Sequence, residues 1–258
     1  MTQIHHFIHL KKQRLLYGRV PKAANSSIKA ALSKLLKNRP PKGTKTTSDR
    51  FWAHSTHSET ELMTLKRARR CRFTHFSFSF VRNPFDRLIA AYNNKVLEIE
   101  EPPLPMLQMG VKHGMPFGDF LQVLVNTPLE KFDVHVIPQN ELLCLGNKIV
   151  PKFIGRVEHI NEHWESLREI VSRHGIELME SLPQKNVRRN ERRSLHSYFK
   201  EDHLIETTLS LYAKDISLFY SDISIEHLIS NKPLPIREPI MSRSLKFSQW
   251  MIENVKKR

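Results

Sequence analysis

Residues 20–29, with the sequence VPKAANSSIK, decide the expected fold because they join a predicted strand to a predicted helix. The apolar run at residues 15–20 is typical of a strand, and residues 28–36 have the spacing of an amphipathic helix. A helix that opens on Asn and Ser offers unpaired backbone N–H groups and the positive end of a dipole. Lys22 adds a full charge to this turn. The segment therefore predicts an anion site, and the alternative is an ordinary capped helix with an isolated lysine.

A second strand–loop–helix unit follows at residues 76–92. Residues 76–82 alternate between apolar and polar, as half-buried strands do. Asn83 can cap the following helix, and Pro84 suits its first position. Arg82 is therefore expected where a strand ends and a helix begins, which is the edge at which open α/β sheets bind ligands. An arginine at that edge is suited to bidentate binding of a phosphate.

Together, the two segments resemble the donor-binding motifs of sulfotransferases that use 3′-phosphoadenosine 5′-phosphosulfate (PAPS). Residues 20–29 resemble the 5′-phosphosulfate loop, and residues 80–92 resemble the 3′-phosphate motif. The resemblance spans roughly residues 15–221, and it is to the Golgi-type carbohydrate sulfotransferases in particular. Three later segments are also similar to that family, and they are residues 135–144, 153–158 and 212–220.

The resemblance implies an α/β fold of three layers, with a central, mainly parallel sheet flanked by helices. This sulfotransferase fold is similar in plan to the P-loop nucleotide kinases. The implied reaction transfers a sulfuryl group from PAPS to a hydroxyl of a carbohydrate, with 3′-phosphoadenosine 5′-phosphate (PAP) as the product and no metal required. The implied partner is the carbohydrate acceptor, with an anionic polysaccharide and a glycolipid both open.

The resemblance also assigns a donor site. Lys22 would stabilise charge on the leaving 5′-phosphate, and Arg82 would hold the 3′-phosphate. Arg189, with Arg188 as the alternative, would close over the donor from a basic loop. Ala90 stands where the family usually has a serine, which removes one hydroxyl donor. The loop residues implied to hold the phosphosulfate are Lys22, Ala23, Ala24, Asn25, Ser26 and Ser27.

Sulfuryl transfer also needs a general base, and histidine has a suitable ordinary pKa. Related enzymes often place a catalytic histidine between the two phosphate motifs, and this makes His54 and His57 the expected catalytic residues. His135 is a further candidate. Glu158 is either a base or a structural partner, and His75, at the start of a strand, is expected to be structural.

Composition agrees with this hypothesis without deciding it. The chain has 258 residues, with 41 Lys and Arg against 26 Asp and Glu, which gives a net charge of +15. Such an excess predicts polyanionic partners. One alternative is a non-enzymatic polyanion-binding protein, although we expect no nucleic-acid partner. The other is a P-loop kinase or nucleotidase, but the loop lacks the Gly-Lys-Ser/Thr ending of a Walker A motif.

The chain is expected to form one sulfotransferase domain over residues 1–230. Residues 231–258 then form a Pro-containing linker and a basic amphipathic helix. We find no long apolar segment typical of a signal peptide or a membrane-spanning helix, and we therefore expect a cytoplasmic protein. Residues 99–117 are expected to be irregular. Further helices are predicted at residues 58–70, 117–126, 159–174 and 195–220.

Overall fold

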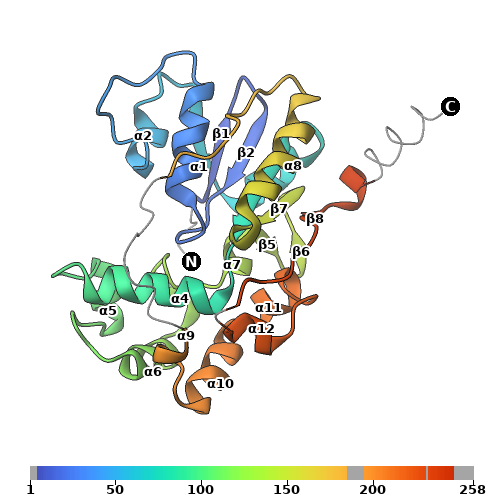
Figure 1. Cartoon of the computed structure of the whole chain (residues 1–258). Coiled ribbons are helices and arrows are strands. Elements are labelled where there is room, and N and C mark those ends of the chain that lie inside the picture. The colour runs from blue at the N-terminus through green and yellow to red at the C-terminus, as the bar shows by residue number, and fades with distance from the viewer. Residues whose placement is uncertain (1–4, 185–194, 231, 247–258) are drawn as a thin grey trace.

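A six-stranded sheet forms the centre of the computed structural model, which describes residues 5–184, 195–230 and 232–246 (Figure 1). The strand order is β3-β1-β2-β4-β7-β8. The strands are β1 (Phe7–Leu10), β2 (Leu15–Gly18), β3 (Thr60–Met63), β4 (Phe76–Val81), β7 (Phe153–Arg156) and β8 (Ile240–Met241). A separate hairpin consists of β5 (Cys144–Leu145) and β6 (Lys148–Ile149).

The sheet is mixed, so the expectation of a mainly parallel sheet is wrong. β2, β4 and β7 run parallel, whereas β1 pairs antiparallel with β2 and β3, and β8 pairs antiparallel with β7. The turn between β1 and β2, at residues 11–14, is too short for a crossover and forces the chain to reverse. Both predicted strand–loop–helix units belong to the parallel part, so the loops after β2 and β4 leave the sheet at the same edge.

Helices cover both faces of this sheet, which confirms the α/β class and the flanking helices (Figure 1). Helices α1 and α8 pack on one face, and α3 and α4 pack on the other. The helices are α1 (Asn25–Leu32), α2 (Asp49–His54), α3 (Leu65–Arg70), α4 (Pro84–Tyr92), α5 (Leu104–Met109), α6 (Phe117–Asn126), α7 (Gln139–Leu143), α8 (Ile160–Ser172), α9 (Leu195–Tyr198), α10 (Asp202–Leu211), α11 (Ala213–Phe219) and α12 (Ile225–Ile229). Short 3₁₀ turns lie at Ser33–Leu35, Cys71–Phe73, Leu129–Lys131 and Val157–His159, and a π-helical turn lies at Asn93–Leu97.

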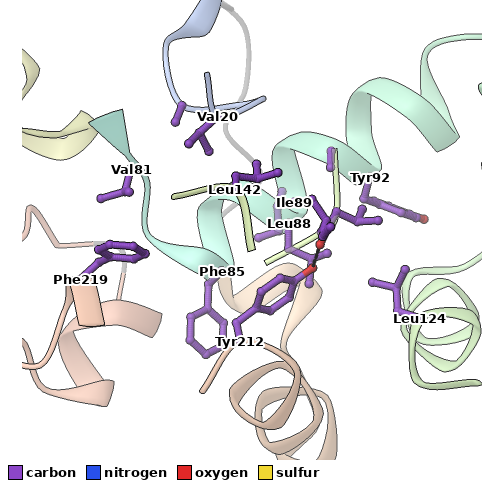
Figure 2. Packing of buried hydrophobic residues seen from close by; sticks show 14 of the residues in the cluster. Val20, Val81, Phe85, Leu88, Ile89, Tyr92, Leu124, Leu142, Tyr212 and Phe219 are labelled. Carbon is purple, nitrogen blue, oxygen red and sulfur yellow. Dashed lines mark hydrogen bonds between the residues drawn. The ribbon is translucent and has the colours of Figure 1, made fainter. Parts of the chain in front are cut away.

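Helix α4, which follows the second predicted motif, is largely buried. Phe85, Leu88 and Ile89 are buried in the larger hydrophobic cluster. Figure 2 shows them beside Tyr212 from the C-terminal helices and Leu142 from α7. Burial of large apolar side chains of this kind stabilises a fold by about 2 kcal/mol each. The first turn of α4, which follows the second predicted motif, is therefore held in a fixed position.

The prediction of one helix over residues 58–70 is wrong, because β3 occupies the middle of that range and α3 follows it. Ser58 has a φ of 63° and does not cap a helix. Glu61 pairs with His9 across the two strands, and its carboxylate lies 3.0 Å from that imidazole. Thr64 caps α3 instead. The Ser–Glu spacing of a capping box was thus coincidental, and the partner strand β1 decided the conformation.

The remaining predicted elements agree in most places. α6 and α8 confirm the helices predicted at 117–126 and 159–174. The range 195–220 contains three helices, α9, α10 and α11, and the irregular range 99–117 contains the short α5. The expected C-terminal helix falls mostly outside the described residues, and the domain boundary near residue 230 stays a prediction. Across the described ranges, no helix combines the length and the apolar content needed to cross a membrane.

Candidate active site

The loops after β2 and β4 lie against each other at one edge of the sheet. Gly18 and Ser79 are register partners near the ends of these parallel strands, and Ser79 Oγ donates a 2.6 Å hydrogen bond to Gly18 O. Beyond the strands, Arg82 Nη1 donates to Lys22 O at 3.4 Å. The structure thus brings together the two residues that the sequence predicts for the 5′- and 3′-phosphates.

The loop after β2 has an unusual backbone conformation. Lys22 and Ala24 have φ values of 67° and 53°, which lie in the left-handed region. Non-glycine residues pay roughly 1–2 kcal/mol for this conformation, and such strain concentrates at functional sites. Left-handed residues next to ordinary ones aim successive N–H groups into a concave, anion-binding nest. The loop runs directly into α1, whose first N–H groups lack acceptors within the helix.

The side chains of residues 23–27 differ in burial and in hydrogen bonding. Tyr17 Oη donates to Asn25 Oδ1 at 3.2 Å, so the amide of Asn25 is oriented from the preceding strand. Ala23 and Ser27 are buried, whereas Ala24, Asn25 and Ser26 are half-buried. Ala23 belongs to the hydrophobic core, and this leaves only its backbone to face a ligand.

The ammonium group of Lys22 is held by a residue that the sequence analysis missed. Lys22 Nζ donates to Asn94 Oδ1, and Asn94 Nδ2 donates to Glu98 Oε2 at 3.1 Å. Asn94 lies on the π-helical turn after α4, and π turns are frequent at functional sites. Asn94 follows Ala90 by four residues, the spacing that puts two side chains on one helical face. Asn94 could have been found from the sequence by this spacing, because Ala90 stands where the family usually has a serine.

The guanidinium of Arg87, on α4, connects three segments of the chain. It is buried, and it donates from Nε to Pro21 O at 3.0 Å and from Nη1 to Ile137 O at 2.8 Å. A longer contact of 3.5 Å reaches Val134 O. These bonds hold the loop after β2, helix α4 and residues 134–137 together. Because its donors face backbone carbonyls, Arg87 positions the site and does not replace the hydroxyl missing at Ala90.

Gln139 and Asp215 form a second support for the site. The side-chain amide of Gln139 bonds both the N–H and the C=O of Arg82, each at 2.9 Å. Asp215 accepts hydrogen bonds from the N–H groups of Gln139 and Asn140, each at 2.7 Å, and so holds the start of α7. Burial raises the pKa of Asp215 to about 6. Tyr212 adds a 2.8 Å bond to Val136 O (Figure 2). The late segment 212–220 thus acts on the site through α7.

His135 has the arrangement of a general base. Its Nδ1 lies 2.7 Å from Asp133 Oδ1, so Nδ1 carries the donated proton and Nε2 carries a lone pair. Burial lowers the pKa of His135 below its ordinary value, and the charges of Lys95 and Lys22 lower it further, against the effect of Asp133. The imidazole is therefore neutral near pH 7, and it lies close enough to Lys22 to respond to its charge.

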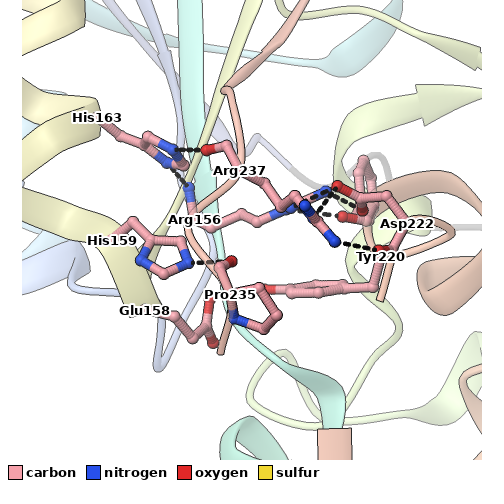
Figure 3. Close-up of polar contacts among 9 residues, drawn as sticks. Arg156, Glu158, His159, His163, Tyr220, Asp222, Pro235 and Arg237 are labelled. Atoms are coloured by element: carbon pink, nitrogen blue, oxygen red, sulfur yellow. Dashed lines mark hydrogen bonds and ion pairs between the residues drawn. The ribbon is translucent and has the colours of Figure 1, made fainter. Parts of the chain in front are cut away.

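Glu158 is a structural partner in this arrangement, one of the two roles considered for it. Its carboxylate accepts a 2.6 Å hydrogen bond from Asn83 N and a 3.0 Å bond from the Tyr220 hydroxyl. Burial raises the pKa of Glu158. Arg156, two residues earlier, pairs with both carboxylate oxygens of Asp222 (Figure 3). Both residues at the end of β7 are thus committed to holding the start of α4 and the C-terminal helices.

His54 and His57 are not brought to the Lys22 loop. They precede β3, which runs in the same direction as β2, so they lie at the edge where β2 begins. Thr60 Oγ1 donates to Trp52 O at 2.7 Å and ties the end of α2 to that edge. A four-residue strand separates the two edges by about 10 Å. Both histidines are exposed there.

Two further predictions concern the basic loop and metal binding. Arg188 and Arg189 lie outside the described residues. Within the described ranges, no group of three or more His, Cys, Asp or Glu side chains is arranged to hold a metal ion.

Comparison with known proteins adds one match. No curated protein and no solved structure matches the chain. A family model described as "Sulfotransferase family" matches residues 5–221. The matched range includes the loops after β2 and β4, the π-helical turn, His135 and Asp215. The chain therefore belongs to the sulfotransferase family.

Proposed function

We propose that this protein transfers a sulfuryl group from PAPS to a hydroxyl of a carbohydrate. The observation that carries the proposal is the contact between Arg82 and Lys22, on neighbouring loops at one edge of the parallel strands. A donor with phosphate groups at both the 5′ and the 3′ positions needs two cationic sites a short distance apart. Membership of the sulfotransferase family supports the sulfuryl group as the one transferred.

The residues present fit such a donor. The nest at Lys22 and Ala24 and the first turn of α1 offer backbone N–H groups, which suit a phosphosulfate. Asn25, Ser26 and Ser27 add side-chain donors to the same turn. We assign Arg82 to the 3′-phosphate, which a planar guanidinium binds through two hydrogen bonds. In the chain as described, Lys22 rests on Asn94, and donor binding would move its ammonium to the phosphosulfate.

The chemical step follows from the same residues. Nε2 of His135 takes the proton of the acceptor hydroxyl as the hydroxyl oxygen forms a bond to sulfur. The bond between sulfur and the bridging oxygen of the 5′-phosphate breaks, and its electron pair stays on that oxygen. Lys22 stabilises the charge that develops there, and Asp133 stabilises the imidazolium of His135. The products are a sulfate monoester and PAP, and the proton ends on His135 before release to water.

His135 is the base in this proposal because Arg87 ties residues 134–137 to the loop that carries Lys22, whereas His54 and His57 lie at the other edge of the sheet. The resemblance to carbohydrate sulfotransferases supports the carbohydrate acceptor. The net charge of +15 favours an anionic polysaccharide, and a glycolipid with an anionic sugar would benefit in the same way.

The proposal is tested by following the label from radioactive PAPS onto a panel of carbohydrate acceptors. Lys22→Ala should lower turnover by at least about a hundredfold, because it removes the charge that stabilises the leaving group. Lys34→Ala is the matched control, because Lys34 is exposed on the turn after α1. Circular dichroism checks that both variants are folded. Turnover near the wild-type value in Lys22→Ala would rule out the assignment of this loop.

A further inference from the structure

The edge of the sheet opposite the candidate active site carries a cluster of basic side chains. Three connections meet at this edge, which lies at the upper end of β1 and β2 in Figure 1. Phe76 N, at the start of β4, donates to Arg14 O in the β1–β2 turn at 3.0 Å. Lys152 N, before β7, donates to Ser77 O at 2.8 Å. We call this cluster the basic pole, and it consists of Lys11, Lys12, Arg14, Arg70, Arg72 and Lys152.

The charges of the basic pole are not balanced locally. Lys152 is half-buried and the other five side chains are exposed. Among the described residues, none of the six forms an ion pair with a carboxylate. Glu59, an acid at this end, accepts hydrogen bonds from Lys37 N and Asn38 N at 2.7 and 2.8 Å. A surface with one sign of charge attracts an anionic partner over about 10 Å at 0.1 M salt.

A large apolar side chain projects from the same surface. Phe73, in the 3₁₀ turn between α3 and β4, is 82% exposed. The guanidinium of Arg72 lies 4.4 Å from the centre of its ring. A shallow groove of about 430 Å³ beside it is lined by Lys66, Arg69, Arg70, Arg72, Phe73 and Leu145. An exposed aromatic ring surrounded by Arg and Lys is typical of surfaces that enter the headgroup region of a membrane.

We propose that the basic pole docks this protein on an anionic lipid surface, with Phe73 inserted among the headgroups. The basic side chains come from separate connections at one end of the sheet, so they spread over a face instead of following one line. A flat array of phosphate groups complements such a face better than a linear polymer does. Because the pole and the Lys22 loop lie at opposite edges of the sheet, docking would leave the candidate active site directed away from the lipid.

Co-sedimentation of the full chain with vesicles tests the proposal. The probes are vesicles of phosphatidylcholine alone and vesicles in which about one-third is phosphatidylserine. The test variant is Arg70→Glu/Arg72→Glu. The matched control is Lys112→Glu/Lys200→Glu, which changes net charge equally at exposed positions after α5 and before α10. We expect binding to the anionic vesicles only, at least about tenfold weaker in the test variant and within about threefold of wild type in the control.

A second variant reports on insertion. In Phe73→Trp made together with Trp250→Phe, the added indole should shift its emission to shorter wavelength when anionic vesicles are added, since the two remaining native tryptophans, Trp52 and Trp164, are buried and report little on the surface. No binding to anionic vesicles, equal losses in both double variants, or no shift at position 73 would each overturn the proposal. Tighter binding of heparin than of vesicles, lost in Arg70→Glu/Arg72→Glu, would assign the pole to a polymer instead. None of these experiments contains a nucleotide, so their results do not depend on whether PAPS is the sulfuryl donor.

Discussion

The side-chain amide of Gln139 forms hydrogen bonds with both the backbone N–H and the backbone C=O of Arg82. Its Oε1 accepts from Arg82 N and its Nε2 donates to Arg82 O, each at 2.9 Å. Gln139 is fully buried, and its own backbone N–H is held by Asp215. The residue proposed to bind the 3′-phosphate is thus fixed at the end of β4 by a residue 57 positions further along the chain.

Gln139→Ala should therefore weaken donor binding more than it slows the chemical step. Two neutral hydrogen bonds contribute about 1 kcal/mol each, so we expect the donor KM to rise at least about tenfold. The kcat should fall less, because the two hydrogen bonds that are lost hold the backbone of Arg82, which is assigned to donor binding. Gln108→Ala, at an exposed position on α5, is the matched control. An unchanged KM in a folded Gln139→Ala protein would show that Arg82 does not need this support.

His135→Ala tests the proposed base. Loss of a general base typically lowers turnover about a hundredfold or more, and the affinity for PAP should stay near that of wild type. His54→Ala and His57→Ala serve as controls, because both side chains are exposed at the other edge of the sheet. A large loss of turnover in His54→Ala or His57→Ala, with turnover kept in His135→Ala, would show that the general base lies in residues 52–58.

The pH profile gives an independent test of His135. A base works only when deprotonated, so kcat/KM should rise with pH through the pKa of His135 and then level off. Burial and the charges of Lys95 and Lys22 hold that pKa below the ordinary 6.5, which places the rise on the acid side of that value. Asp133 raises the pKa of His135, so Asp133→Asn should move the rise to still lower pH and reduce the plateau. A shift to higher pH would contradict this pairing.

Gly155 tests the packing of β7 on β4. A Cβ at this position would lie 2.3 Å from Phe80 Cε1, in the core beneath α8. Gly155→Ala should lower the free energy of unfolding by about 1–3 kcal/mol, because the buried ring of Phe80 has to move. Denaturant unfolding measures this loss. Gly118→Ala, whose Cβ would meet nothing closer than 3.8 Å, is the control and should change stability little.

The sequence predicted the local parts of the site well. β2, the loop at residues 20–24 and α1 are consecutive, as are β4, the Asn83 cap and α4, and each unit follows from its own residues. Parallel pairing of β2 with β4 then places both loops at one edge. Arg82 and Lys22 could therefore be predicted as neighbours from the general behaviour of such sheets.

The supporting contacts were not predictable in the same way, because they join residues far apart in the chain. Arg87 reaches Pro21 across 66 positions, and such a contact leaves no local pattern. The expected role of His54 and His57 rested on their place between two motifs. Which edge of the sheet they occupy depends on the direction of β3, and the sequence had suggested a helix there.

The central claim is that one site binds a nucleotide through both its 5′- and 3′-phosphates, and calorimetric titration with PAP tests it most directly. We predict binding in the micromolar range without magnesium, with ADP and AMP at least about tenfold weaker and with weakened PAP binding in Arg82→Ala. No binding of PAP, or equal binding of ADP that requires magnesium, would contradict the account.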